Sequence, residues 1–349
     1  PGAPGYGYPG YGGYTSVLAP KPSIIPLRPL SIGEILGGAF ESLRANPKAM
    51  FVPSLVVMSI VGLMSAGSLA LFMSRLGLPN LASGKIELSE AETRARLDQL
   101  GSSLVGLFVQ LGVTSVLSML ATSIIIGLLI VTVSRTILGR KASLSDVWQR
   151  TKPRVWALIG QAVIIQLIFT AVLAAAIGVF LAFFLGLRIP DLVDNASPDD
   201  AVGTILLTIL GLFVLVALVG LGMFALYCKL SMAPAALILE NVGVFEGISR
   251  SWALTRGYFW RVVGIQILSF LIISLASAIV TTPISMLAGV ITAAAPSAQI
   301  LALGMSVLLG NIVTAATLPF DSAVNALIYT DLRMRSEGLD VELRRAAGV

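Results

Sequence analysis

Long stretches without any charged residue dominate the chain. They lie between the charged residues Lys48 and Arg75, Asp98 and Arg135, Arg154 and Arg188, Asp200 and Lys229, and Arg261 and Asp321. An apolar helix of about 20 residues crosses the hydrocarbon core of a bilayer, where a charged side chain is costly. The last stretch is long enough for two crossings, and TAAAPSAQ around Pro296 supplies a turn between them. The pattern therefore predicts six transmembrane helices.

An amphipathic pattern precedes each pair of predicted crossings. The first follows the helical spacing i, i+3, i+4, i+7, i+8 and i+11 at Ile32, Ile35, Leu36, Ala39, Phe40 and Leu43. Ser31 and Glu34 have the spacing of a capping box at the start of this helix. Similar patterns begin at Ser143 and near Asn241. Helices of this kind with basic flanks lie in the membrane interface.

An internal repeat links the second and third of these patterns. Residues 148–156 read WQRTKPRVW and residues 252–260 read WALTRGYFW, and they contain all four tryptophans of the chain. The fold class predicted is an all-α integral membrane protein with six transmembrane helices. We expect three repeats, at about residues 31–135, 143–229 and 241–331, each an interfacial amphipathic helix followed by a helical hairpin. Tryptophan is enriched at membrane interfaces, so we interpret these side chains as interfacial anchors: Trp148, Trp156, Trp252 and Trp260.

The distribution of charge gives an orientation. The net charge is +5, and 18 of the 23 Lys and Arg residues fall on one side of the predicted membrane. Short loops on the cytoplasmic side of a membrane are enriched in Lys and Arg. The basic side is therefore the cytoplasmic one, and both termini are expected there. The excess of positive charge is thus explained by topology, and no nucleic-acid partner is predicted.

The composition argues against an enzyme. The chain is 56% hydrophobic and 12% charged, has no histidine, and has Cys228 as its one cysteine. Histidine is the commonest general base and the commonest metal ligand. No Walker-type phosphate loop is present either. We therefore expect no enzymatic activity, no metal and no cofactor.

Few polar side chains lie within the predicted crossings. Ionisable residues in such positions are candidates for function, and Asp321 and Asn325 share a helix face at i, i+4. Four roles fit this pair: lining a polar cavity, binding a proton or cation, pairing with a Lys or Arg of another repeat, or forming hydrogen bonds between helices. Gln110 and Gln266 also lie within the predicted crossings. The intramembrane polar candidates selected for function are Asp321, Asn325, Asn311, Gln161 and Gln166.

The domain organisation is a membrane domain between two tails. Residues 1–26 begin with a segment rich in Pro, Gly and Tyr, and residues 341–349 form a short C-terminal tail. A segment of this composition buries too little apolar surface to offset its ordering entropy, so we expect residues 1–26 to be disordered. The six-helix membrane domain is predicted at residues 27–340.

Three stretches carry a family resemblance: LRPLSIGEILGGAFESLRANPKAM at 27–50, KLSMAPAALILENVGVFEGISRSWALTRGYFWRVV at 229–263 and PFDSAVNALIYTDLRMRSEGLD at 319–340. They resemble the bacterial glycerophosphoryl diester phosphodiesterase membrane domain family. The Pro/Gly/Tyr-rich tail is similar to that of the actinobacterial proline- and glycine-rich transmembrane proteins. The resemblance covers about residues 27–340 and implies a membrane fold in a bacterial plasma membrane. The family takes its name from members in which the membrane domain is fused to a phosphodiesterase domain. We expect that phosphodiesterase domain to be absent here, so the resemblance implies no catalytic residue.

Two functions fit these features. The first is a non-enzymatic membrane module that binds lipid or a protein partner, which is either another protein or a second copy of the chain. The second is a transporter or exporter component for a lipid or small amphiphile, suggested by Asp321 within a span that contains Pro319. Membrane lipids are the expected partners in both cases.

Overall fold

The computed structural model describes residues 25–26, 28–76, 90–140, 143–186 and 198–338. No strand occurs in these ranges, and six helices are long and apolar enough to cross a membrane. This confirms the predicted all-helical fold with six membrane-spanning helices. The six helices are α2 (Pro47–Leu76), α3 (Glu90–Ile137), α5 (Val155–Gly186), α7 (Pro198–Leu230), α10 (Phe259–Ala294) and α11 (Gln299–Glu337).

Shorter helices precede each pair of long ones. They are α1 (Ile32–Ala45), α4 (Leu144–Thr151) with the 3₁₀ turn η2 (Lys152–Arg154), and α9 (Val244–Arg256), while η3 (Pro296–Ala298) joins α10 to α11. Their order along the chain agrees with the order expected from sequence; the relation between the copies as repeats stays a prediction. Helix α8 (Ala233–Leu239) was not predicted, because it is too short to give a periodic pattern.

Local caps determine where the short helices begin. The Ser31 side chain accepts a hydrogen bond from the Glu34 backbone, and the Glu34 carboxylate accepts one from the Ser31 N–H, so the predicted capping box is present. Ser143 caps α4 in the predicted way. The third helix begins slightly later than expected: its N-cap is Gly243, and Asn241 adopts a left-handed backbone conformation with φ of 60°.

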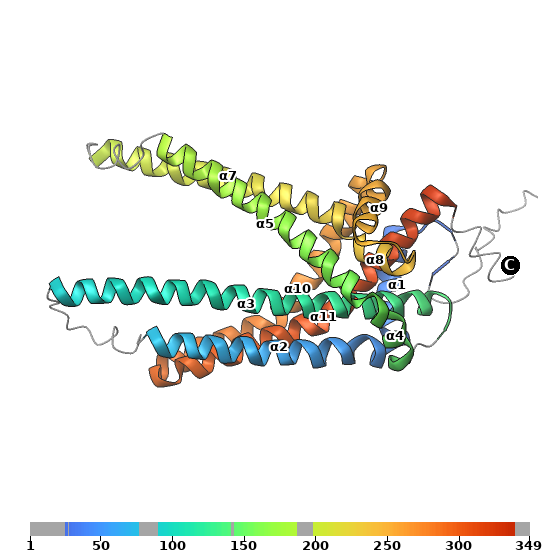
Figure 1. The fold of residues 1–349 in the computed structure, drawn as a ribbon, viewed down its shortest axis with the longest axis horizontal. Coiled ribbons are helices and arrows are strands. Elements are labelled where there is room, and N and C mark those ends of the chain that lie inside the picture. Colours follow the sequence, from blue (N-terminus) through green and yellow to red (C-terminus); the bar gives the residue numbers. More distant parts are fainter. Residues whose placement is uncertain (1–24, 27, 77–89, 141–142, 187–197, 339–349) are drawn as a thin grey trace, which may run out of the picture.

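The three pairs of long helices do not pack alike. Helices α2, α3, α10 and α11 run together, and α11 packs closely against α2 (Figure 1). Helices α5 and α7 run together as a separate pair, which diverges from the others toward the end far from α1, α4, α8 and α9 (Figure 1). The four short helices gather at one end, where all the long helices converge.

Small residues allow the close contact between α2 and α11. A side-chain carbon added to Gly62 of α2 would lie 2.9 Å from the Cβ of Asn311 on α11. Ala315, Ala323 and Ala326 of α11 are also buried. Because lipid tails are as apolar as the helices, association in a membrane depends on close packing of this kind.

A buried carboxylate joins three parts of the chain near the end of α11. The Asp331 side chain accepts hydrogen bonds from the Leu30 N–H at 2.7 Å, from Arg261 of α10 at 2.9 Å and from Arg335 at 2.9 Å. Both arginines also donate to the Leu30 carbonyl. The side chain of Asp331 is 1% exposed, so its charge depends on these partners rather than on water.

A second ionic cluster lies at the same end of the molecule. Glu240, just after α8, pairs with Arg250 of α9 and with Arg333 of α11, and Tyr329 donates a hydrogen bond to it. Burial raises the pKa of the Glu240 carboxyl, but these hydrogen bonds and positive charges outweigh it and hold the pKa below its usual value. The cluster connects α8, α9 and α11.

The large apolar side chains of the short helices lie partly on the outside. Phe245 of α9 is 74% exposed, while Gly247 and Ser251 on its other face are buried. Trp156 and Trp260, at the starts of α5 and α10, are 82% and 80% exposed. Such surfaces suit a lipid environment, and their role as interfacial anchors stays a prediction.

One boundary of the predicted domains needs correction. Ile25 falls within the segment 1–26 that was expected to be disordered, yet it is fully buried in the apolar core together with Leu30. Leu30, five residues later, donates its backbone N–H to the buried Asp331 carboxylate. Residues 1–24 and the tail 341–349 lie outside the described residues.

Asp331→Asn should destabilise the protein by roughly 3 kcal/mol, because it leaves two arginines without their carboxylate partner. Asp146→Asn is the matched control. It breaks an ion pair with Arg135 at a carboxylate that is 52% exposed, and such pairs contribute about 0–1 kcal/mol. Unfolding followed by intrinsic tryptophan fluorescence in mild detergent measures both. Equal stability of the two variants would contradict the central role of Asp331.

The predicted orientation places η3 outside the cell and α1 inside. Cys228 is buried, so a Cys228→Ala background provides a chain for introducing single exposed thiols. Ser297→Cys lies in η3 and Gly33→Cys lies in α1, and both positions are exposed. A membrane-impermeant maleimide added to intact cells should label the first variant and leave the second unlabelled until the cells are opened. The opposite result would invert the topology.

Candidate functional site

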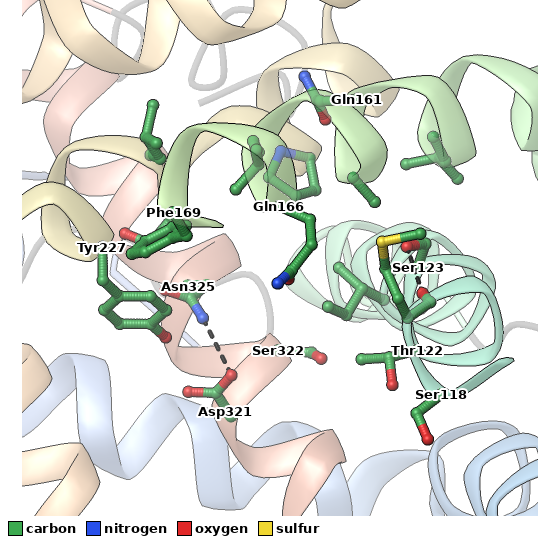
Figure 2. Close-up of a pocket in the computed structure, with 18 of the residues that line it drawn as sticks. Ser118, Thr122, Ser123, Gln161, Gln166, Phe169, Tyr227, Asp321, Ser322 and Asn325 are labelled. Carbon is green, nitrogen blue, oxygen red and sulfur yellow. Dashed lines mark hydrogen bonds between the residues drawn. The ribbon is translucent and has the colours of Figure 1, made fainter. Parts of the chain in front are cut away.

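A cavity of about 570 Å³ lies between α3, α5, α7, α8 and α11 (Figure 2). Its volume is within the range typical of small-molecule sites. On α3 the lining extends from Ser115 to Ile130, which corresponds to about 22 Å along the helix axis. The cavity is therefore elongated, with one long side formed by α3 and the facing side formed by α5.

Helix α11 contributes a connected set of polar groups. The Asn325 amide donates to a carboxylate oxygen of Asp321 at 3.3 Å, one helical turn away. Gln266 of α10, which is 2% exposed, donates to the Asn325 carbonyl at 2.6 Å and is 3.5 Å from the Ser231 hydroxyl. Gln266 thus fixes the Asn325 amide in the orientation that turns its N–H groups toward Asp321.

Aromatic side chains lie close to these polar groups. Tyr227 of α7 and Phe169 of α5 both line the cavity. Figure 2 shows the Tyr227 ring beside Asp321 and Asn325, with Phe169 on the α5 side of the same space. An aromatic ring presents a negative face, so this wall is suited to contact with a positively charged group.

Hydroxyl and amide groups line the rest of the cavity. Ser118, Thr122 and Ser123 lie on α3, with Ser322 of α11 directed toward them (Figure 2). The Ser123 hydroxyl donates to its own helix, to the Met119 carbonyl. Buried polar atoms normally have hydrogen-bond partners. Two cavity-lining side chains have a buried oxygen atom without a partner among the described residues, namely Gln161 Oε1 and Ser322 Oγ.

The charge of the site comes from one side chain. Among the described residues that line the cavity, Asp321 carries the one carboxylate, and no Lys or Arg is present. Asp321 takes part in none of the ion pairs formed between described residues. Lys229 follows the lining residue Tyr227 by two positions, but its amino group does not enter the cavity lining. Its Nζ lies 5.3 Å from the centre of the Trp252 ring and 5.0 Å from the centre of the Phe259 ring.

The cavity reaches the protein surface along α3 and α5, two of the helices that are long and apolar enough to cross a membrane. Ser115 and Gln166 are exposed, whereas Ser322 in the same lining is buried. Gln166 is ten residues beyond Trp156, so it lies about 15 Å along α5 from the predicted interface. Half of a typical hydrocarbon core is about 15 Å thick. With Trp156 at the predicted interface, Gln166 is expected near the middle of the bilayer.

Four of the five predicted intramembrane polar residues meet in this cavity. They are Asp321, Asn325, Gln161 and Gln166. Asn311 does not: its amide donates to the Val307 carbonyl one turn earlier, and its side chain packs against Gly62 of α2. It belongs to the contact between two helices. The four tryptophans do not line the cavity either.

Sequence reasoning did not identify several lining residues. Tyr227 and Phe169 look like ordinary membrane-helix residues, and serine and threonine are common in such helices. Gln266 does not line the cavity itself; it lies behind Asn325, and this contact spans 59 positions in sequence. No local signal predicts which helix faces meet.

Comparisons with known proteins identify a family for this chain. A domain of unknown function, DUF7847, matches residues 30–332. The chain belongs to this family. No curated protein and no solved structure matches it. These matches do not confirm the resemblance to the glycerophosphoryl diester phosphodiesterase membrane domain family. The description of the DUF7847 family names no activity.

Proposed function

We propose that the protein is a non-enzymatic membrane module that binds an amphiphile in the cavity between α3, α5, α7, α8 and α11. One observation carries this proposal: a cavity with a polar cluster at Asp321 and Asn325 reaches the protein surface beside Gln166, within the apolar length of α5. A ligand that enters there comes from the bilayer, so it has an apolar part. A ligand that uses the polar cluster also has a polar part.

The shape of the cavity supports the same class of ligand. The long wall of α3 carries apolar side chains such as Val116, Met119 and Ile126 between its hydroxyl groups. The polar cluster of α11 shares its part of the lining with Ser231 and with Pro234 of the short helix α8. This combination suits an acyl or alkyl chain along α3 with its headgroup toward Asp321. Membrane lipids are thus the partners proposed, in a bacterial plasma membrane with both termini in the cytoplasm.

A second candidate is a carrier that moves the same amphiphile across the membrane. It is favoured by the position of Asp321, two residues after Pro319 inside α11, and by the divergence of the α5–α7 pair from the other long helices (Figure 1). A proline inside a helix removes one backbone hydrogen bond and permits a bend. Many transporters bind their substrates where Pro or Gly interrupts a membrane helix. Here α11 continues through Pro319 as one helix.

Filling the cavity should remove a bound lipid. Thr122→Trp places a large side chain in the cavity, while Leu111→Trp places the same side chain on an exposed, non-lining part of α3. Native mass spectrometry of each variant in mild detergent, with lipids and proteins identified together, should show a retained lipid with wild type and Leu111→Trp and its loss with Thr122→Trp. Equal lipid retention by all three proteins would refute binding in the cavity. A stoichiometric protein in place of a lipid would favour a partner-binding module.

The carrier hypothesis has its own measurement. Proteoliposomes that contain the full chain and a fluorescent short-chain lipid should show protein-dependent movement between leaflets, and Asp321→Asn should slow it on the order of tenfold, because a charge-assisted contact is lost. Movement unaffected by this substitution would argue against a role for the carboxylate in transport. Binding without movement would leave the first proposal standing alone.

A further inference from the structure

We propose that the cavity selects an amphiphile with a cationic headgroup, an amine or a quaternary ammonium, and that Asp321 is the residue that binds the positive charge. This inference rests on the proposed function and specifies its ligand class. It is based on the charge balance of the lining, the arrangement of Asn325 and Gln266, and the aromatic side chains beside them.

The charge balance excludes an anionic headgroup. Phosphate and sulfate groups are bound in proteins by arginine, lysine or free backbone N–H groups. None of the described lining residues is an arginine or a lysine, and the one charged residue is acidic. An anion placed here would lie beside a carboxylate in a medium of low dielectric constant, where repulsion between like charges is strong.

Asp321 differs from the other acidic residues that face the interior. Asp331 is paired with Arg261 and Arg335, and Glu240 with Arg250 and Arg333. Asp321 accepts one hydrogen bond, from Asn325, and takes part in no ion pair among described residues. A carboxylate removed from water is stabilised by a cation, or else it becomes protonated. A cationic ligand supplies the kind of partner that this chain gives to Asp331 and Glu240.

The neighbouring amides hold the carboxylate in place for such a ligand. The bond from Asn325 ends on Oδ2 of Asp321, and Asn325 is itself fixed by the 2.6 Å hydrogen bond from Gln266. The second carboxylate oxygen, Oδ1, receives no hydrogen bond from the described residues. It is therefore the natural acceptor for an ammonium group in the cavity.

The aromatic wall adds a second contact for a cation. Tyr227 and Phe169 border the same space as Asp321 (Figure 2). Cations lie favourably over aromatic faces, and this contact strengthens where water is excluded. A quaternary ammonium, which donates no hydrogen bond, still benefits from both the rings and the carboxylate. The hydroxyl groups of α3 then lie along the first part of the ligand chain.

Matched photoreactive probes test the inference on the full chain. Two alkyl diazirines of equal length are used, one with a trimethylammonium headgroup and one with an uncharged maltose headgroup, in an uncharged maltoside detergent. Peptide mass spectrometry measures labelling in the lining segments, residues 115–130 and 158–169. The cationic probe should label them on the order of tenfold more strongly, as expected for a contact with a charged group. Thr122→Trp should abolish specific labelling by both probes.

The variants separate the inference from the proposed function. Asp321→Asn should reduce labelling by the cationic probe to the level of the uncharged probe, and Asp321→Glu should retain the preference. Asp146→Asn, an exposed carboxylate outside the cavity, should change nothing. Equal labelling by the two probes in wild type, removed by Thr122→Trp, would overturn the cationic headgroup while amphiphile binding stands. Labelling that is insensitive to Thr122→Trp would overturn both. Because the headgroup comparison uses the wild-type chain, it does not depend on the folding of any variant.

Discussion

The buried carboxylate of Asp331 is the interaction on which the rest of the structure depends. It joins the segment before α1, the start of α10 and the end of α11 through Leu30, Arg261 and Arg335, and the first of these contacts links positions 301 residues apart. In a membrane, apolar surfaces give little preference for one helix arrangement over another, because lipid is as apolar as protein. Directional, charged contacts near the ends of the long helices supply that preference. They fix the ends of α10 and α11, and close packing along α2 and α11 follows from there.

The same principle explains why a cavity exists beside α3. The start of α5 is held by Arg154, which donates to the Asn241 and Val242 carbonyls ahead of α9. The end of α7 is held by Ser251 of α9, which donates to the Lys229 carbonyl at 2.6 Å. These anchors lie at one end of the α5–α7 pair, and the pair diverges from the other helices beyond them (Figure 1). The cavity lies next to this anchored end. Its lining includes the first part of α5 and the last turn of α7.

Two aspartates on α11 show how position decides chemistry. Asp321 and Asp331 are ten residues apart, about 15 Å along the helix. Asp331 lies near the end of α11, where Arg261 and Arg335 reach it while their own side chains stay 22% and 25% exposed. Asp321 lies deeper, among amides, hydroxyls and aromatic rings, and no arginine of the described residues reaches it. The first therefore serves as a structural ion pair, and the second is available for a ligand.

The sequence by itself determined the six crossings, their approximate limits and the capped starts at Ser31 and Ser143, because hydrophobic length and helix caps are properties of adjacent residues. It also singled out Asp321 and Asn325, since a polar pair one turn apart shares a face on any helix. The tertiary structure decided which polar residues share a site. Gln161 and Gln166 of α5 join Asp321 there, and Asn311 of α11 does not, because each outcome depends on the rotation and pairing of helices far apart in sequence. Ile25, in a segment of disordered composition, is buried in the core, and Leu30, five residues later, donates to a carboxylate 301 residues away, a contact that no local pattern encodes.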